Sequence, residues 1–323
     1  MIALVTGATG FIGSRLVEHL LKRGTNEVYA LVRNPSKLAW MKSAAGLHLL
    51  TGDLFSLPPL PANCEVVFHL AGLTKAVKPD DYYTVNQMGT ASLLNKLVSS
   101  GLNSRLIFLS SLAAGSPAIK GKPVKEDVRS DPASPYGKSK LLSEQEILKH
   151  KDRMETVILR AAAVYGPGDR DFLQFFQFIN GGWLFTFTKK ITMSLCYVDD
   201  LVQAMEICAL SVLRSGEIYN VADPIPRTWE DIGSEAARIL NRKVKKIRAP
   251  LWLARTAAGA SEWASRITGK PSTLNLSKYR DMEKLSWVAD TSKIKRDLGF
   301  ETTWSFTEGL EETLQWYKDN RWL

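Results

Sequence analysis

The turn after the first apolar run constrains the fold more than any other feature of this chain. The run IALV is followed by TGATGFIG and then by a segment with helical apolar spacing, FIGSRLVEHLLKRG. The glycines Gly7, Gly10 and Gly13 permit a tight turn, a close approach of the backbone to a ligand, and close packing of a helix on a strand. This order of strand, glycine-rich turn and helix predicts the first unit of a parallel α/β sheet.

The first half of the chain repeats this alternation. Further strand-like runs are VYALVR, LHLLTGDL, VVFHLAG, LIFLSS and TVILRAAAVYG, and further helix-like segments are NQMGTASLLNKLVSSG and YGKSKLLSEQEILKH. Parallel strands need crossover connections, which helices provide. We therefore expect an α/β fold with a Rossmann-type doubly wound parallel sheet and a smaller, discontinuous C-terminal substrate domain.

The character of the sequence changes after Pro167. The run FLQFFQFINGGWLFTF is aromatic and irregular, IPRTWEDIGSEAARILNRK predicts a capped helix, and SFTEGLEETLQWYKDNRWL predicts a closing amphipathic helix. We therefore expect a nucleotide-binding domain over residues 1–166, with returning segments at about 191–223. Residues 167–190 and 224–323 form the expected substrate-binding part and C-terminal helix.

Composition narrows the class of protein. The 42 Lys and Arg against 33 Asp and Glu give a net charge of +9, which favours anionic ligands, but no nucleic-acid-binding module is recognisable, so we expect no nucleic-acid partner. Three scattered cysteines and four histidines without ligand spacing predict neither a disulfide framework nor a metal site. The N-terminus lacks the regions of a signal peptide and no apolar run is long enough to span a bilayer, so we expect a cytoplasmic protein.

The glycine turn predicts a dinucleotide site. The backbone of Thr9, Phe11 and Ile12, together with the three glycines, would hold a pyrophosphate at the helix N-terminus. Arg33 ends the second strand-like run, Lys37 follows it, and no acidic residue stands there to bind a ribose 2′-hydroxyl. This favours NADP(H) over NAD(H). Two solvated loop charges are the alternative, and with that alternative NAD(H) stays possible.

Two further strand ends extend this site. Asp53 is placed to accept a hydrogen bond from an adenine amino group and Leu54 to pack on the ring, although Asp is also a common turn residue. Ala71 and Gly72 are small residues where the next strand would meet the cofactor. His69 lies inside that apolar strand, and we expect it in the core rather than as a ligand.

The segment SPYGKSK places Tyr136 and Lys140 one turn apart on one face of a helix. Ser134 would cap this helix, and Pro135 suits its first position. A tyrosine with an ordinary pKa of about 10 is a poor acid or base near neutrality unless a cation stabilises its phenolate, and Lys140 is close enough to do so. The pair predicts an acid/base centre, and a solvated helix face is the alternative.

Taken together, TGATGFIG, GDL, FHLAG, VNQMGT, FLSSLAA, YGKSK and LRAAAVYGPGD resemble the motifs of the extended short-chain dehydrogenases/reductases, the NAD(P)-dependent epimerase/dehydratase superfamily. The branch that this sequence resembles most is the 3β-hydroxysteroid dehydrogenase and dihydroflavonol reductase-like one. The resemblance implies that Ser111, Tyr136 and Lys140 are catalytic, with Ser110 as the adjacent candidate. It also implies that Asn86 supports the lysine through water, and that the protein forms a homodimer.

The resemblance implies an NAD(P)-dependent dehydrogenase/reductase. We expect NADP(H)-dependent interconversion of a ketone and a secondary alcohol on an apolar or amphipathic small molecule, with Tyr136 as general acid/base. Sugar-nucleotide members carry an arginine shortly before the VDD segment, where this chain has Met193, although Lys189 and Lys190 could substitute. A sugar-nucleotide epimerase or dehydratase with tightly bound NAD(H) is the alternative. A non-catalytic cofactor sensor is the third hypothesis, and the presence of all three of Ser111, Tyr136 and Lys140 argues against it.

Two more segments bear on substrate and surface. The aromatic residues between Phe172 and Phe187 could wall an apolar pocket or pack as a lid or interface. Residues 250–267 form a possible helix with basic and aromatic residues, which is typical of a membrane-surface helix and also of packing with solvated charge. The residues concerned are Trp252, Arg255, Trp263 and Arg266. Peripheral membrane contact is therefore an open alternative.

Overall fold

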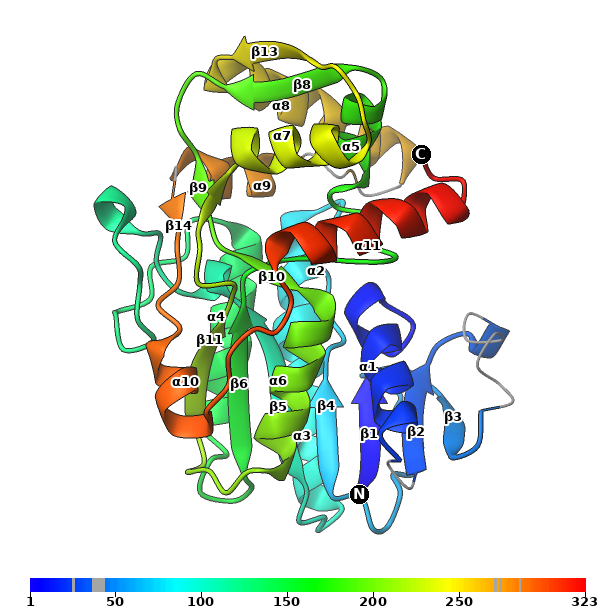
Figure 1. Ribbon diagram of the computed structural model, residues 1–323. Coiled ribbons are helices and arrows are strands. Elements are labelled where there is room, and N and C mark those ends of the chain that lie inside the picture. The colour runs from blue at the N-terminus through cyan, green and yellow to red at the C-terminus, as the bar shows by residue number, and fades with distance from the viewer. Residues whose placement is uncertain (25–26, 37–43, 270–271, 273–274, 285) are drawn as a thin grey trace.

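A parallel seven-stranded sheet forms the lower part of the molecule in the computed structural model (Figure 1). The structure describes residues 1–24, 27–36, 44–269, 272, 275–284 and 286–323. The strand order is β11-β6-β5-β4-β1-β2-β3. The strands are β1 (Ile2–Thr6), β2 (Glu27–Val32), β3 (Leu47–Thr51), β4 (Val66–His69), β5 (Arg105–Ser111), β6 (Thr156–Ala161) and β11 (Glu217–Val221). The predicted Rossmann-type fold class is confirmed.

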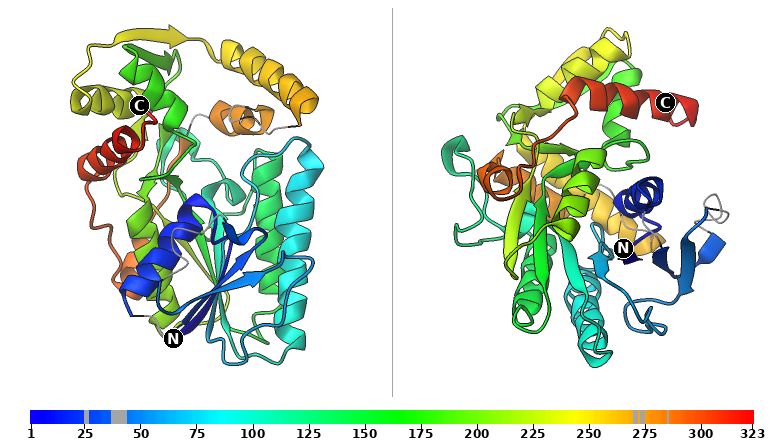
Figure 2. Two further views of the ribbon diagram at one scale, coloured as in Figure 1. Left: turned by 90° about the vertical axis from the view of Figure 1, so that its right-hand side faces the viewer. Right: turned by 60° about the horizontal axis from the view of Figure 1, so that its bottom comes forward.

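Helices cover both faces of this sheet, and the left view of Figure 2 shows the three layers. One face packs against α1 (Phe11–Lys22) and α6 (Val198–Leu210), and the other against α3 (Gly89–Ser99) and α4 (Pro135–Leu148). Successive residues of a strand point to opposite faces, so Val5 joins the first core and Leu4 the second. Burial on both faces explains why these strands read as continuous apolar runs.

The helix predicted from Asn86 onward begins earlier. The chain becomes helical at α2 (Pro79–Tyr82), passes through a π-helical turn over Tyr83–Met88, and continues as α3. Proline suits a first helical turn because it has no N–H to leave unpaired. Asn86 lies within the π-helical turn, and such turns are frequent at functional sites because they redirect a side chain.

The aromatic segment after Pro167 is not irregular, so that prediction is wrong. It forms α5 (Leu173–Asn180) and β8 (Trp183–Phe187), which pairs in parallel with the distant β13 (Lys245–Ala249). Phe172, Phe176 and Ile179 recur at helical spacing and are buried together. The helix is stabilised by this packing, and the strand by a partner that local sequence does not reveal.

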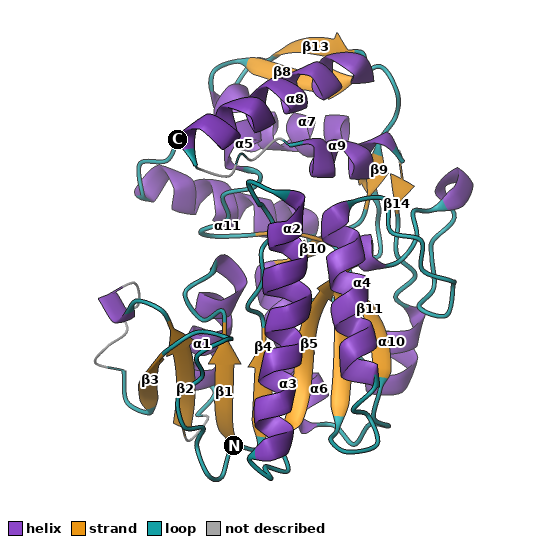
Figure 3. Cartoon of the chain, turned by 180° about the vertical axis from the view of Figure 1, so that it is seen from behind, coloured by secondary structure: helices purple, strands orange, loops and turns teal. Residues whose placement is uncertain are grey.

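The remaining elements lie above and beside the sheet (Figures 1 and 3). As predicted, α7 (Trp229–Ile239) is capped, with Thr228 and Asp231 forming a capping box, and α11 (Phe306–Asp319) is a closing helix with one buried face. The others are β7 (Ala163–Tyr165), β9 (Thr192–Met193), β10 (Leu195–Tyr197), β12 (Arg227–Thr228), β14 (Ser286–Trp287), α8 (Leu251–Thr268), α9 (Leu276–Glu283) and α10 (Ser292–Leu298). Within the described ranges, no helix has both the length and the apolar character that crossing a bilayer requires.

Candidate active site

The glycine turn between β1 and α1 is closely packed. Gly7 has φ of 72°, and a Cβ there would lie 2.7 Å from the backbone nitrogen of Ala71 at the end of β4. A Cβ at Gly13 would lie 2.1 Å from the carbonyl oxygen of Gly7. Glycine at both positions therefore brings α1, the turn and the end of β4 into direct backbone contact.

The N-terminus of α1 fits a diphosphate. Gly10 caps this 12-residue helix without a side-chain hydrogen bond, and the first turn contains no acidic residue. Phe11 and Ile12 pack their side chains against the aromatic core, and Thr9 is exposed beside Gly10. Backbone N–H groups at a helix N-terminus attract anions through hydrogen bonds and the helix dipole, so this turn offers what a dinucleotide's pyrophosphate needs.

The outer strands place the predicted adenosine residues at the same edge of the sheet. Arg33 is exposed directly after β2, whereas Lys37 lies outside the described residues. Asp53 Oδ1 accepts hydrogen bonds from the backbone N–H groups of Phe55 and Ser56, both at 2.8 Å. Leu54 is only 6% exposed and packs in the core, which leaves little of its side chain for a ring to contact.

Gly72 connects the cofactor edge to the centre of the site. A Cβ at this position would lie 3.0 Å from Asn86 Oδ1 and 4.0 Å from Lys140 Nζ. The loop after β4 therefore runs directly over the polar groups of the π-helical turn and of α4. Asn86 holds this loop by accepting from the N–H of Leu73 at 2.7 Å and donating to its carbonyl at 3.1 Å.

Helix α4 starts as the sequence predicts. Ser134 is its N-cap and accepts a hydrogen bond from the Gly137 N–H at 3.0 Å, and Pro135 is its first residue. Tyr136 lies in the first turn and is half-buried. Burial raises the pKa of Tyr136 to about 12, a hydrogen bond with Ser111 opposes this rise, and the charges of Asp281 and Asp171 add to it. The phenol is therefore protonated at neutral pH.

The structure distinguishes Ser111 from Ser110. Ser111 Oγ accepts from the Ala113 N–H at 3.2 Å and reaches Tyr136, whereas Ser110 Oγ donates to Glu144 Oε1 at 2.5 Å. Adjacent strand residues point to opposite faces, so only one of the two can meet the tyrosine. Ser110 belongs to a buried structural group in which Arg160 forms an ion pair with Glu144 at 2.7 Å.

Lys140 is 6% exposed. Its Nζ donates to the carbonyl oxygen of Leu109 at 2.6 Å and lies 4.1 Å from the centre of the Phe108 ring. Burial lowers the pKa of Lys140 to about 7, and the charge of Glu144 opposes this shift. Near neutrality the amine therefore exchanges between its charged and neutral forms, directly below the tyrosine's helix turn.

A buried polar chain ends at Asn86. His69 contacts Thr6 Oγ1 through Nδ1 at 2.7 Å and Thr90 Oγ1 through Nε2 at 2.9 Å, and the Thr90 hydroxyl donates to the Asn86 carbonyl at 2.6 Å. Because the Thr90 proton is used there, Nε2 must be the protonated nitrogen of His69. Burial lowers the pKa of His69 to about 3, so it is a neutral core residue, as expected. The sequence did not indicate this chain, because its members lie far apart.

Four charged residues that the sequence did not indicate close over the site. Asp171 pairs with Lys75 and, at 3.0 Å, with Lys278 on α9. Burial disfavours its charge, but both lysines hold the pKa of Asp171 below its ordinary value. Asp281, also on α9, accepts from Ser134 Oγ at 3.0 Å, while its Oδ1 is buried without a partner among the described residues. Burial raises the pKa of Asp281 to about 7.

The predicted aromatic wall is divided. Phe172 and Phe176 are core residues, and Phe175 stacks edge-on against Trp229 at 4.9 Å between ring centres. Phe178 and Phe185 form an exposed pair on the surface. Packing within the protein therefore accounts for Phe172, Phe175 and Phe176.

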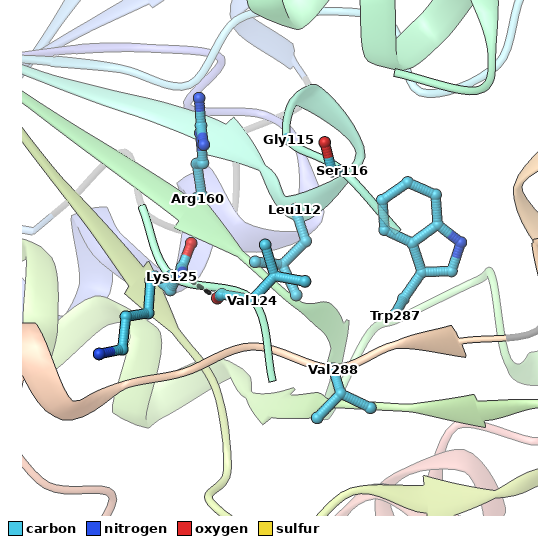
Figure 4. A pocket seen from close by; sticks show the side chains of 9 residues that line it. Leu112, Gly115, Ser116, Val124, Lys125, Arg160, Trp287 and Val288 are labelled. Atoms are coloured by element: carbon cyan, nitrogen blue, oxygen red, sulfur yellow. Dashed lines mark hydrogen bonds between the residues drawn. The ribbon is translucent and has the colours of Figure 1, made fainter. Parts of the chain in front are cut away.

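A small pocket lies beside the residues that follow Ser111 in the chain (Figure 4). Leu112, which follows Ser111, lines it together with Trp287, and Figure 4 shows both near Ser116. The Trp287 indole N–H donates to the Asp281 carbonyl at 2.7 Å. Through Trp287 the pocket is thus connected to Asp281 on α9, which in turn bonds to Ser134, the N-cap of the helix that carries Tyr136.

Comparisons with known proteins agree with this geometry. The chain is 28% identical over 327 residues to a ceramide reductase of Caulobacter vibrioides, covering 100% of this chain and 96% of that protein. It is 28% identical over 333 residues to a UDP-glucose 4-epimerase of Vibrio cholerae, covering 97% and 94%. The structure of MoeE5 with UDP-glucuronic acid and NAD has the same fold, with a TM-score of 0.77, 24% identity, and coverage of 99% and 100%. The model of the NAD dependent epimerase/dehydratase family matches residues 3–222, and the chain belongs to this family of enzymes.

Proposed function

We propose that this protein is an NADPH-dependent ketoreductase that interconverts a ketone and a secondary alcohol on an apolar or amphipathic molecule. The observation that carries the proposal is the contact of Tyr136 with Ser111, with Lys140 one turn below on the same helix. A phenol with a raised pKa is a group that holds a proton until negative charge develops next to it. That is the requirement of carbonyl reduction.

The proposed chemistry assigns one role to each side chain. When bound, the reduced nicotinamide supplies the hydride that adds to the carbonyl carbon. Ser111 donates a hydrogen bond to the carbonyl oxygen and orients it, and Tyr136 transfers its phenolic proton to that oxygen as negative charge develops there. The charged form of Lys140 stabilises the resulting phenolate. Asn86 holds the loop that covers this centre.

The proposed preference for NADP(H) depends on Arg33. This residue is exposed directly after β2, where an acidic residue would bind a ribose 2′-hydroxyl. A guanidinium offers paired N–H donors that match the oxygens of a 2′-phosphate. The contact of Asp53 with the adenine is also part of this proposal, and its use of Oδ1 in the local turn leaves Oδ2 for that contact.

The proposed substrate class rests on Met193 and on the ceramide reductase relative. Met193 occupies the position where sugar-nucleotide members of the family carry an arginine, and it packs against the aromatic core. The second candidate is a sugar-nucleotide epimerase or dehydratase, which the epimerase relative supports. Lys189 and Lys190 are exposed just before β9 and could bind a phosphate in that case.

A measurement of released nucleotide together with turnover tests the proposal. The purified protein is denatured, the released nucleotide is identified, and NADPH oxidation is followed with a panel of apolar ketones. Stoichiometric NADPH consumption supports the ketoreductase, whereas tightly retained NAD(H) with conversion of a nucleotide sugar supports the epimerase. Tyr136→Phe should lower turnover by about 10²- to 10⁴-fold while leaving NADPH affinity intact. Full activity of this variant would refute the assigned role.

A further inference from the structure

In helix α8 the small residues face the protein and the large apolar residues face outward. This is the reverse of an ordinary surface helix. Its buried residues are Ala254, Ala258 and Ser265. Its large apolar side chains are exposed: Trp252 is 62%, Leu253 42%, Trp263 69% and Ile267 66% exposed. A helix normally turns its large apolar residues toward the core, because their burial contributes most to stability. In α8 the alanines take that place.

The exposed apolar residues share one face of α8. Trp252 and Trp263 are about three helical turns apart, and Ile267 follows one turn later, so the three form a stripe along the helix. The opposite face rests on Tyr279 of α9 and on Phe187 of β8, and small side chains permit this close approach. Figure 3 shows α8 at the upper end of the molecule, away from the seven-stranded sheet.

Basic residues border this stripe. Arg255 and Arg266 are exposed and, at helical spacing, lie together along one side of it. Strand β13, which leads into α8, carries Lys245, Lys246 and Arg248, all exposed. Residues 242–269 contain seven Lys and Arg and one acidic residue, Glu262, so this segment carries a formal charge of 7 − 1 = +6. Part of this charge is paired, because Glu230 of α7 contacts Lys246 and Arg248, and Glu262 contacts Arg266 at 3.1 Å.

We propose that α8 docks the protein on an anionic membrane surface, with the helix lying in the plane of the interface. Tryptophan side chains favour the membrane interface because the ring is apolar and the indole N–H can still find a polar partner. Arginines beside the apolar stripe would meet acidic headgroups, and each adds to the attraction. This face of α8 therefore matches both the apolar acyl chains and the acidic headgroups of a lipid surface.

A second copy of the chain fits this face less well. In a two-fold symmetric contact the same face would meet itself, so the arginines and the lysines of β13 would come close to their own copies. Like charges at such an interface oppose association, whereas an anionic lipid surface satisfies them. The stripe has the composition of an interfacial helix, and its surroundings supply the positive charge that such helices use.

Co-sedimentation with vesicles tests the proposal, using the full chain without cofactor or substrate. Phosphatidylcholine vesicles with and without phosphatidylglycerol are compared at low and at physiological salt. We expect binding to the anionic vesicles. The triple variant Trp252→Ser/Trp263→Ser/Ile267→Ser should weaken it at least about tenfold, and Arg255→Ser/Arg266→Ser by about fivefold per arginine at low salt. All five side chains are exposed, so the fold should tolerate these changes, and melting temperature checks this.

Matched variants elsewhere on the surface control for apolar area and charge. Ile119→Ser/Val212→Ser removes two exposed apolar side chains, and Lys151→Ser/Arg153→Ser removes two exposed charges. Both should bind vesicles like the unmodified protein. No binding to anionic vesicles at low salt would overturn the proposal, and so would equal losses in the α8 and control variants. A dimer in solution that the triple variant dissociates would also overturn it, because a second copy would then cover the stripe. Ketone reduction is measured separately, so failure here leaves the proposed reaction untouched.

Discussion

Asp281 of α9 accepts a hydrogen bond at 3.0 Å from Ser134, the residue that caps the helix of Tyr136. One contact thus joins a C-terminal helix to the first turn that carries the proposed acid. Burial raises the pKa of Asp281 to about 7, and its charge raises the pKa of Tyr136. The protonation of Asp281 is therefore coupled to the proton affinity of the tyrosine.

Asp281→Asn should change the pH dependence of stability. Between about pH 4 and pH 7 the unfolded protein loses this proton while the folded protein keeps it, so the stability that Asp281 contributes is present at acid pH and is lost as pH rises. The variant should lack this loss, which is up to about 1.4 kcal/mol per pH unit. Urea unfolding across this range measures it, with exposed Asp152→Asn as control. Parallel curves for Asp281→Asn and the unmodified protein would contradict the raised pKa of Asp281.

The same substitution should shift the pH profile of the proposed ketone reduction. Without the negative charge on Asp281, the pKa of Tyr136 falls, and the phenol loses its proton at lower pH. The alkaline limb of kcat/KM for ketone reduction should therefore move to lower pH, by up to about one unit. A profile recorded with saturating NADPH tests this. If the alkaline limb does not move in the variant, the charge of Asp281 does not influence the pKa of Tyr136.

Lys140→Met should remove activity and a second pH dependence. The pKa of Lys140 is lowered from its ordinary value to about 7, so between about pH 7 and 10.5 the unfolded chain binds a proton that the folded chain does not. Unmodified protein therefore gains stability as pH rises through this range, by up to about 1.4 kcal/mol per unit from this residue. The variant should lose that gain. Lys138→Met, exposed on the same helix, is the matched control and should keep it.

Arg33→Ala should reduce the preference for NADPH. Loss of a charge-assisted hydrogen bond to the 2′-phosphate should weaken NADPH binding by about 10- to 100-fold and leave NADH binding unchanged. Titration of both cofactors against Arg33→Ala and the exposed control Arg214→Ala gives the ratio. An unchanged ratio in Arg33→Ala would show that another group selects the cofactor.

Gly13→Ala should destabilise the cofactor turn, whereas Gly259→Ala should not destabilise α8. A Cβ at Gly13 would lie 2.1 Å from the Gly7 carbonyl oxygen, while a Cβ at Gly259 meets nothing within 4 Å. We expect a loss of about 1–3 kcal/mol in the free energy of unfolding for the first and a gain of about 0.5–1 kcal/mol for the second. Denaturant unfolding measures both. Equal effects would contradict the packing argument.

Local sequence predicted the parts of the site that lie within one segment. The phase of Tyr136 and Lys140, the cap at Ser134 and the glycine turn each follow from residues a few positions apart. Local sequence did not separate Ser110 from Ser111, because that choice depends on which face of β5 meets α4. The aromatic segment was misread for the same reason, since β8 pairs with a strand far along the chain.

The sequence by itself determined the alternation of strands and helices, the glycine-rich turn after β1 and the helical phase of Tyr136 and Lys140, because apolar periodicity and glycine stereochemistry act over a single turn or strand. Only the tertiary structure placed Asp281 and Asp171 close enough to act on Tyr136, with Lys75 and Lys278 paired to Asp171, and only it showed that α8 buries its alanines and exposes its tryptophans. Contacts between distant segments decide charge environment and exposure. Neither is encoded in the spacing of neighbouring residues.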